Sequence, residues 1–366
     1  MGKCEISKRA IDSVTILFLL GVLVLLFMTP FSQTEANILF SRHITIESFL
    51  VRNIFQYFHS DWSMRILFFL FSVGSIVLYR SILESYFEKN SSYYNLALLI
   101  FILLPGVTLS FILVNYATIP IFLTLLIVYS YKKEFNILLV LAMVLLLFTH
   151  SAQFVIYLAI VLYSYQKKRW WLTLLAIGFI LLASSVSVYE IDGIPRGHLV
   201  QLVGIYAAIF SPTLFLLVVY AVYKVAIRGD KEILWYIVVT ALTISVLLSI
   251  RQAIKITDFA PFVVISIPLV VTVFRDSLAI RLKEFRKIYY LVCNVIVLVL
   301  LLETSVIFLH YPLYRYTPFK ELLLDTSIYE IPQIVEELKD KGKVCKDEIS
   351  KKDYTLYLYY GVARCP

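Results

Sequence analysis

Apolar residues follow one another in long runs along most of this 366-residue chain, and short polar segments separate the runs. The strands of a membrane barrel alternate apolar and polar residues over about ten positions, whereas these runs are apolar throughout. A transmembrane helix needs about 20 mainly apolar residues in succession. The pattern therefore predicts an all-α, polytopic transmembrane helical bundle.

The polar breaks set the ends of about eleven expected spans. These spans lie near residues 12–30, 63–83, 93–105, 110–131, 135–149, 152–166, 170–188, 200–223, 233–250, 260–275 and 287–308. Pro105-Gly106 and Pro120 interrupt the third and fourth runs, so one of these two segments is alternatively a re-entrant helix. Residues 1–308 then form a transmembrane domain.

Residues 309–366 form a small separate segment with mixed α/β character. A helix is expected over Ile331–Lys341, and an aromatic alternating run follows at Tyr354–Tyr360. Cys345 and Cys365 both lie in this segment, where a disulfide is the more common use of two nearby cysteines than a metal site. We therefore predict a Cys345–Cys365 disulfide.

The composition also indicates a chain that is embedded in lipid. Of its residues, 60% are hydrophobic and only 16% are charged, and the mean hydropathy is +0.85. A net charge of +8 indicates nucleic-acid binding in many soluble proteins. Here the basic residues cluster in short loops between spans, which is typical of cytoplasmic loops. The clusters are Lys3–Arg9, Lys132-Lys133, Lys167–Arg169, Lys224–Lys231 and Arg275–Lys287.

This distribution predicts a multi-pass protein of the cytoplasmic (inner) membrane with its N-terminus in the cytoplasm. An odd number of spans then places the C-terminal segment outside the cytoplasm. We expect membrane lipids as partners and no nucleic acid. The sequence contains no nucleotide-binding loop, zinc spacing or nucleophile elbow, so an enzyme that uses cytosolic nucleotides is disfavoured.

Three predicted outer segments are longer than minimal loops: residues 31–62, 189–199 and 251–259. The first has apolar residues at helical spacing from Ile46 to Phe58. It is either an amphipathic helix in the membrane interface or a helix packed over the bundle.

Charged residues at membrane depth or at the outer face need a reason, because an ionisable side chain is costly in a bilayer. Arg251 and Lys255 are four residues apart, Arg196 and His198 are two apart, and all four are predicted at one membrane face. Together they favour a site for a phosphate or pyrophosphate at the headgroup level. The alternative is anchoring by phospholipid headgroups.

Further candidates remain near the same face. Glu35 is the lone acid after the first span, and it is either a general base or a solvated loop carboxylate. Arg42, His43, Arg65 and Asp258 are candidate contacts to a donor or an acceptor. His150, Glu190, Asp192 and Glu303 are the other charged or titratable residues in such places.

The order of these features resembles the C-type integral-membrane glycosyltransferases, in particular the group of protein O-mannosyltransferases and lipid A aminoarabinose transferases. Gln33-Thr34-Glu35-Ala36-Asn37 occupies the place of the family's outer acidic motif, and the stretch from His59 to Arg65 resembles the entry to its second span. Leu104-Pro105-Gly106 is similar to a family Ser-Pro turn. The segment Ser249–Pro261, followed by Pro268-Leu269, resembles its Ser, Lys, aromatic, Pro and Pro-Leu series.

The resemblance implies that a sugar moves from a polyprenyl-phosphate carrier to lipid A, a glycan or a protein. By position, Lys255 inherits contact with the donor phosphate, and His198 falls where the family often has an outer-loop His. In this interpretation Lys255, Arg251, Arg196 and His198 would together neutralise the leaving lipid phosphate. Glu35 would accept the proton of the acceptor, and a divalent metal is compatible with the site. Two positions depart from the family pattern: Thr34 replaces the first acid, and Asn115–Thr118 lacks the usual aspartate.

Two other classes stay open. An O-antigen or exopolysaccharide polymerase is equally polytopic, but its usual long outer loops are missing here. A flippase or transporter for lipid-linked sugars often shows internal repeats or charged midplane helices, and the sequence shows neither clearly.

Overall fold

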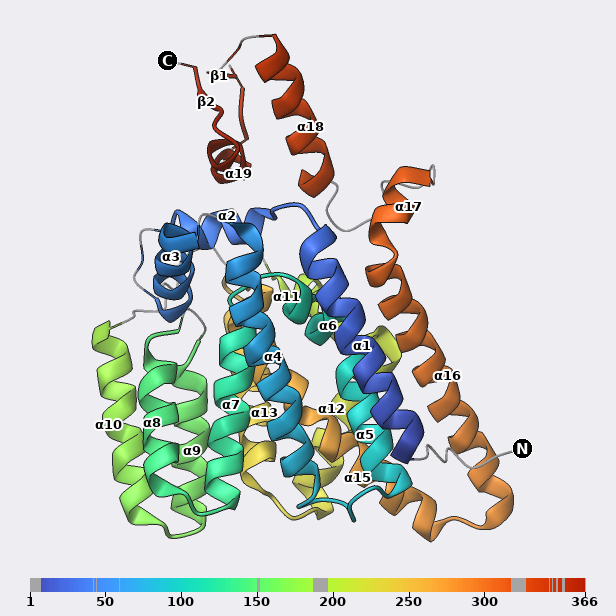
Figure 1. Cartoon of the computed structure of the whole chain (residues 1–366). Helices are drawn as coiled ribbons and strands as arrows, with labels where there is room; N and C mark the ends of the chain where they lie inside the picture. The colour runs from blue at the N-terminus through green and yellow to red at the C-terminus, as the bar shows by residue number, and fades with distance from the viewer. Residues whose placement is uncertain are drawn as a thin grey trace.

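The computed structural model describes residues 8–41, 43, 45–58, 60–149, 152–186, 197–316, 327–341, 343, 345–346, 348–350 and 353–365. These residues form a helical bundle with a small C-terminal segment at one end (Figure 1). The helices are α1 (Lys8–Met28), α2 (Gln33–Leu39), α3 (Ile46–Phe58), α4 (Asp61–Leu83), α5 (Ser92–Leu103), α6 (Pro105–Ile112), α7 (Thr118–Lys132), α8 (Asn136–Leu147), α9 (Phe154–Gln166), α10 (Trp170–Val186), α11 (Leu199–Phe210), α12 (Pro212–Arg228), α13 (Ile233–Ser249), α14 (Ile256–Val263), the 3₁₀ turn η1 (Val264–Ser266), α15 (Ile267–Ile280), α16 (Lys283–Phe308), α17 (His310–Tyr316), α18 (Ser327–Asp340) and α19 (Tyr354–Tyr359).

The predicted all-α polytopic class is confirmed, whereas the number of spans is not. Among the described residues, four helices are long and apolar enough to cross a membrane: α1, α4, the continuous stretch Thr257–Ile280, and α16. Two bent pairs, α5 with α6 and α11 with α12, raise this number to six if each pair is one span. The shorter apolar helices α7, α8, α9, α10 and α13 have 12 to 17 residues, or about 18–26 Å against a hydrocarbon core of about 30 Å. Eleven crossings therefore remain a prediction.

Two predicted spans are wrong as continuous helices. The run 110–131 is interrupted at residues 113–117, because α6 ends at Ile112 and α7 begins only at Thr118. The run 200–223 breaks between α11 and α12, whose axes differ by 104°. Ser211 has a φ of 71°, and Pro212 begins α12, where the missing N–H of proline costs nothing. At the interrupted third run, Leu104-Pro105 separates α5 from α6 by a 58° bend. Proline at the first helical position explains both breaks.

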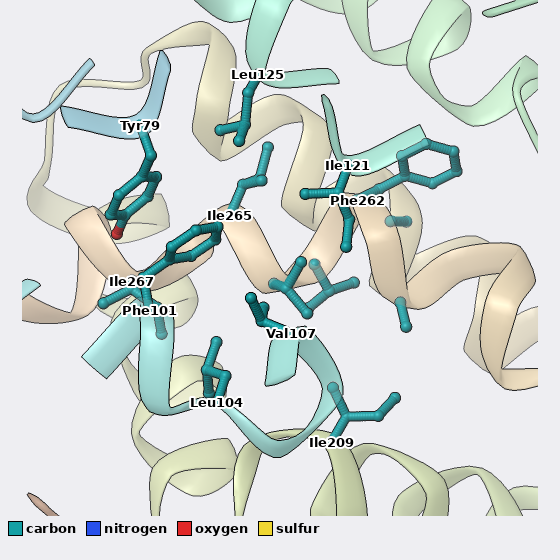
Figure 2. Packing of buried hydrophobic residues seen from close by; sticks show 14 of the residues in the cluster. Tyr79, Phe101, Leu104, Val107, Ile121, Leu125, Ile209, Phe262, Ile265 and Ile267 are labelled. Atoms are coloured by element: carbon teal, nitrogen blue, oxygen red, sulfur yellow. The ribbon is translucent and has the colours of Figure 1, made fainter. Parts of the chain in front are cut away.

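The two breaks pack against each other and against the stretch Thr257–Ile280, which is the most buried of the four long helices. Gly106 lies so close to α11 that an added Cβ would be 2.5 Å from the Cγ2 of Ile209. Tyr79 of α4 stacks on Phe101 of α5 with ring centroids 4.0 Å apart. Figure 2 shows Tyr79, Phe101 and Ile209 among the buried residues around Ile265 of η1 and Ile267 of α15. Side-chain packing therefore fixes the direction of both bent pairs.

Basic loops gather at the end of the bundle opposite α2, α18 and α19, which we call the lower end (Figure 1). Lys132 Nζ donates to Glu232 Oε2 at 2.6 Å, which joins the loops after α7 and α12. Arg169 pairs with Glu134 at 3.6 Å, and Arg275 Nη1 donates to the carbonyl of Tyr86 at 3.4 Å. One end of the bundle thus holds the basic clusters that the sequence assigns to the cytoplasm. Sidedness itself stays a prediction.

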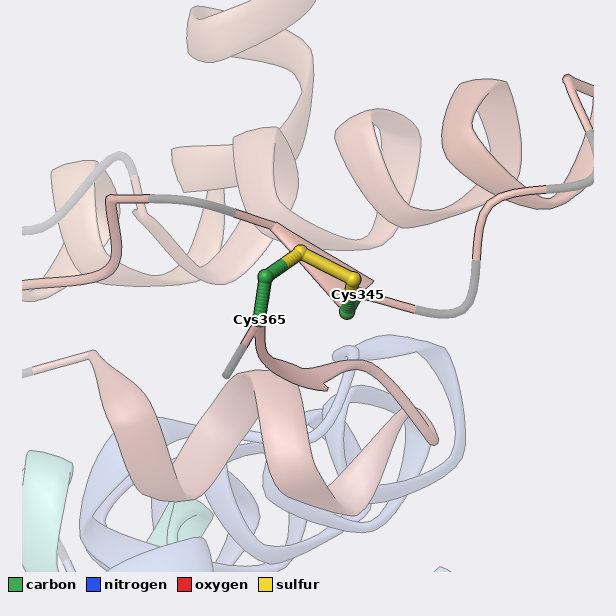
Figure 3. Close-up of a disulfide and its surroundings, with 2 residues drawn as sticks. All are labelled: Cys345 and Cys365. Atoms are coloured by element: carbon green, nitrogen blue, oxygen red, sulfur yellow. A yellow bond between two sulfur atoms is a disulfide. The ribbon is translucent and has the colours of Figure 1, made fainter.

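The C-terminal segment lies beyond α2, at the upper end of the bundle (Figure 1). It contains α18, α19 and a two-stranded parallel sheet of β1 (Cys345–Lys346) and β2 (Ala363–Arg364). The structure joins Cys345 to Cys365 in a disulfide, the pair that the sequence predicts (Figure 3). The aromatic run at Tyr354–Tyr360 forms the helix α19.

Candidate functional site

The connection from α1 to α2 places Glu35 in a reciprocal helix cap. Ser32 Oγ accepts the backbone N–H of Glu35 at 3.3 Å, and Glu35 Oε2 accepts the backbone N–H of Ser32 at 2.7 Å. This capping box is a local property of the sequence Ser-x-x-Glu at a helix start. The carboxylate of Glu35 is therefore oriented by its own helix before any long-range contact.

Arg65, in the second turn of α4, completes the arrangement. Its Nε and Nη2 donate to Glu35 Oε1 and Oε2, both at 2.7 Å, in a bidentate ion pair. Its other N–H groups donate to the backbone carbonyls at the end of α1. These carbonyls belong to Leu26 (3.0 Å), Thr29 (2.6 Å) and Pro30 (2.9 Å). All five guanidinium donors are thus used, and the positive charge lies at the negative end of the α1 dipole.

Glu35 is only 1% exposed and accepts a fourth hydrogen bond from the backbone N–H of Val114 at 3.3 Å. A carboxylate has about four lone-pair positions, and donors occupy all of them here. The described contacts favour a role in holding α1, α2, α4 and the start of the α6–α7 connection together. Proton acceptance by Glu35 stays a prediction, and it requires that the pair with Arg65 open.

The predicted phosphate-binding cations lie around the end of α13. Arg251 and Lys255 are exposed in the connection from α13 to α14. The backbone N–H of His198 donates to the carbonyl of Ser249 at 2.9 Å, and its Nδ1 faces Gln201 Oε1 at 3.2 Å. The structure thus brings His198 beside the loop that carries Arg251 and Lys255.

The remaining predicted residues lie in different environments, and some lie outside the described residues. Asp258 is 4% exposed in the first turn of α14, where its carbonyl accepts the backbone N–H of Ala152 at 3.3 Å. His43 is exposed, and its carbonyl accepts a hydrogen bond from Ser48 Oγ at 2.9 Å. Arg42, Arg196, His150, Glu190 and Asp192 lie outside the described residues.

Sequence reasoning missed one buried acid. Glu47, in the first turn of α3, is 0% exposed. The backbone N–H of Ile46 donates to the carbonyl of Phe148 at 2.9 Å, so the start of α3 lies against the α8–α9 connection, which also contacts Asp258. Thr45 Oγ1 accepts the N–H of Ser48 at 3.2 Å, as in a helix N-cap. This pattern in the sequence indicates that a helix starts here and that Glu47 lies in its first turn.

The described part of the chain contains no cluster of side chains that is arranged as a metal site. Across those residues, no group of three or more His, Cys, Asp or Glu side chains is arranged to hold a metal ion. Cys293, the described cysteine outside the disulfide, is buried within α16.

No protein-family model matches the sequence, and no curated protein matches it. Solved structures do match. ArnT from Cupriavidus metallidurans in the apo state superposes with a TM-score of 0.56 at 12% sequence identity, over 96% of this chain and 86% of that chain. ArnT bound to undecaprenyl phosphate gives 0.58 at 11% identity, over 96% and 85%. This chain has the ArnT fold.

ArnT is a lipid A aminoarabinose transferase of the C-type class. The match confirms the fold resemblance drawn from the Glu35 and Ser249–Pro261 regions. An identity of 11–12% shows a shared architecture and does not assign individual residues.

Proposed function

We propose that this chain is a membrane glycosyltransferase that takes a sugar from a polyprenyl-phosphate carrier at the outer membrane face. The observation that supports it most is the shared fold with ArnT, over 96% of the chain, in a structure that contains undecaprenyl phosphate. Exposed Arg251 and Lys255 supply the positive charge that a lipid phosphate needs. The acceptor is a hydroxyl of lipid A, a glycan or a protein.

In this proposal the acceptor oxygen attacks the anomeric carbon as the bond from that carbon to the phosphate oxygen breaks. The electron pair of the broken bond stays on the departing polyprenyl phosphate, and the hydroxyl proton passes to a base. Arg251, Lys255 and His198 neutralise the charge that grows on the leaving phosphate. The reaction consumes no nucleotide, because the sugar is already activated on its carrier.

The Glu35–Arg65 pair fixes the connection from α1 to α2 against α4. Arg65 ties the end of α1 to α4, and Glu35 ties α2 to both, so the first outer connection has one defined shape. Preorganised connections reduce the cost of orienting two substrates. We assign Glu35 a positioning role, and its predicted role as proton acceptor is tested separately below.

The decisive experiment incubates purified protein in liposomes with radiolabelled polyprenyl-phosphate sugar and an outer-membrane lipid extract. We expect labelled sugar in the acceptor fraction and release of free polyprenyl phosphate in equal amount. Unchanged labelled lipid that crosses the bilayer indicates a flippase instead. Long repeating products formed only from a polyprenyl-pyrophosphate glycan indicate a polymerase.

A further inference from the structure

One tyrosine of the C-terminal segment contacts both segments that bear the buried ion pair. The ring of Tyr359 stacks on Phe31, with centroids 3.8 Å apart and planes 19° apart. Its hydroxyl donates a short hydrogen bond to Oδ1 of Asp61. Phe31 immediately precedes the Ser32–Glu35 capping box, and Asp61 lies one turn before Arg65 on α4. Tyr359 therefore bridges the α1–α2 connection and the start of α4.

A second contact lies on the same face of α19. Thr355 Oγ1 and Asn37 Oδ1 of α2 are 2.6 Å apart. Thr355 and Tyr359 are four residues apart, so they share one helix face. The helix α19 thus lies alongside α2. Thr355 contacts the middle of α2, and Tyr359 lies next to Phe31, just before the N-terminus of α2.

The disulfide holds α19 in this place. A helix of six residues is too short to be stable in water by itself. Cys345 and Cys365 close a loop around it, and the N–H of Cys365 donates to the carbonyl of Lys346 at 3.1 Å (Figure 3). Within the loop, Lys346 Nζ donates to the hydroxyl of Tyr357 at 3.0 Å. These bonds present Tyr359 to the bundle in a fixed orientation.

Charge and burial agree with the bridge. Asp61 and Tyr359 are both half-buried, so their hydrogen bond is shielded from competing water. Burial, followed by the hydrogen bond to Asp61 and then by the charge of Asp61, raises the pKa of Tyr359 above its ordinary value. The phenol therefore stays protonated and remains a donor to the Asp61 carboxylate.

We infer that Tyr359 is a positioning residue of the proposed transferase, and that the disulfide-bonded C-terminal segment clamps the first outer connection onto α4. The clamp itself is a structural statement about residues 31–39, 61 and 354–359, whereas its effect on turnover rests on the proposed function. Reduction of the Cys345–Cys365 disulfide would release the clamp. We therefore expect the shape of the α1–α2 connection to depend on the redox state of this disulfide.

A cross-link tests the clamp without any activity. In a Cys4→Ser background, Asn37→Cys with Thr355→Cys should form a disulfide under mild oxidation, which peptide mass spectrometry detects. Asn37→Cys with Tyr354→Cys is the matched control, because Tyr354 is exposed on another face of α19. Equal cross-linking of both pairs, or of neither, overturns the docked arrangement.

Hydrogen exchange then tests the role of the tyrosine hydroxyl. Tyr359→Phe keeps the stacked ring and loses only the bond to Asp61. We expect faster amide exchange in residues 33–39, and the same effect in the Cys345→Ser/Cys365→Ser variant. Tyr354→Phe should exchange at the wild-type rate. Wild-type exchange in Tyr359→Phe contradicts the clamp, whether or not the protein transfers sugar.

Turnover separates positioning from catalysis. We expect Tyr359→Phe to lower kcat by roughly 10-fold, the equivalent of one charge-assisted hydrogen bond, with unchanged binding of undecaprenyl phosphate. The Asn37–Thr355 cross-link should restore most of this loss, because it replaces the lost bond in holding α19. Failure of the cross-link to rescue turnover indicates that Tyr359 acts directly on substrate and overturns the positioning role. Absence of turnover in the wild type contradicts the proposed function alone.

Discussion

Arg65 and Glu35 form a bidentate ion pair that is almost completely buried, with side chains 2% and 1% exposed. The guanidinium also binds carbonyls at the end of α1, and the carboxylate also accepts the backbone N–H of Ser32, the N-cap residue of α2. Burial of two charges is costly unless every donor and acceptor finds a partner. Here each does, so one pair fixes the geometry of a helix end, a helix start and α4.

Loss of one partner should therefore destabilise the bundle strongly. We expect Glu35→Gln to lower the free energy of unfolding by about 3–5 kcal/mol, because it leaves the buried guanidinium without a counter-charge. Thermal unfolding in detergent measures the effect. Glu84→Gln is the control, since Glu84 pairs with the exposed Lys89 and should unfold like the wild type.

The same variant distinguishes the two roles considered for Glu35. A holding role predicts that stability and turnover fall together in Glu35→Gln. A general base predicts that turnover is lost at unchanged stability, since the substitution removes proton acceptance and little volume. Wild-type stability of Glu35→Gln would show that the pair with Arg65 does not hold these helices.

The exposed cations give a second prediction. Arg251→Ala and Lys255→Ala should each weaken binding of undecaprenyl phosphate by roughly 10-fold or more, the scale of one hydrogen bond to a charged group. Lys283→Ala removes an exposed cation at the lower end and should leave binding unchanged. Binding is measured with purified protein in lipid nanodiscs at fixed salt. Equal losses in all three variants indicate only general attraction to anionic lipid.

The sequence predicts where the helices of this fold lie along the chain better than it predicts how they are oriented relative to one another. Long apolar runs identify nearly every helix, because lipid and protein interiors both select apolar residues. Pro212 was visible in the run 200–223, yet a proline at the start of a following helix interrupts no apolar pattern. The 104° turn arises from packing between α6 and α11, which no local periodicity encodes.

The candidate site was predictable residue by residue, and its pairings were not. Glu35 and Arg65 each stand out as charges near an apolar run, but they are 30 positions apart and meet only through the packing of α1 on α4. From the sequence alone, Arg65 is a candidate contact to donor or acceptor, and nothing local indicates its pairing with Glu35. The aromatic run in the tail gave no indication that Tyr359 reaches Asp61, because that contact spans 298 positions.

A third prediction concerns the close approach of the two helix breaks. Gly106→Ala should lower the free energy of unfolding by about 1–3 kcal/mol, because the new Cβ lies 2.5 Å from Ile209 Cγ2 and must push α11 away. Gly178→Ala is the matched control within α10, where an added Cβ meets nothing within 4 Å. That control should be neutral or more stable, since alanine favours helix over glycine. Thermal unfolding of both variants decides, and equal stability would show that α6 and α11 do not touch there.

The last prediction is the pH at which the clamp opens. Burial, and then the charge of Asp61, raises the pKa of Tyr360 to about 12, whereas an exposed tyrosine titrates near about 10. A raised pKa means that the docked state holds this proton more tightly than the undocked state. Its contribution to docking is therefore complete below pH of about 10 and is lost as the pH rises through about 12.

Spin labels at exposed positions 40 and 354 report this opening through their separation, measured from pH 8 to 12.5 in a Cys4→Ser background. We expect a narrow, short distance below pH of about 10 and a broad, longer one once the pH has risen through about 12. Tyr360→Phe cannot ionise at this position, so its transition should move to higher pH. Tyr354→Phe, placed with the label at position 358 instead, should open with the wild type, because Tyr354 is exposed on another face of α19 than Thr355 and Tyr359. An unchanged transition in Tyr360→Phe would mean that other groups, such as the lysines of the tail, control the docking of α19.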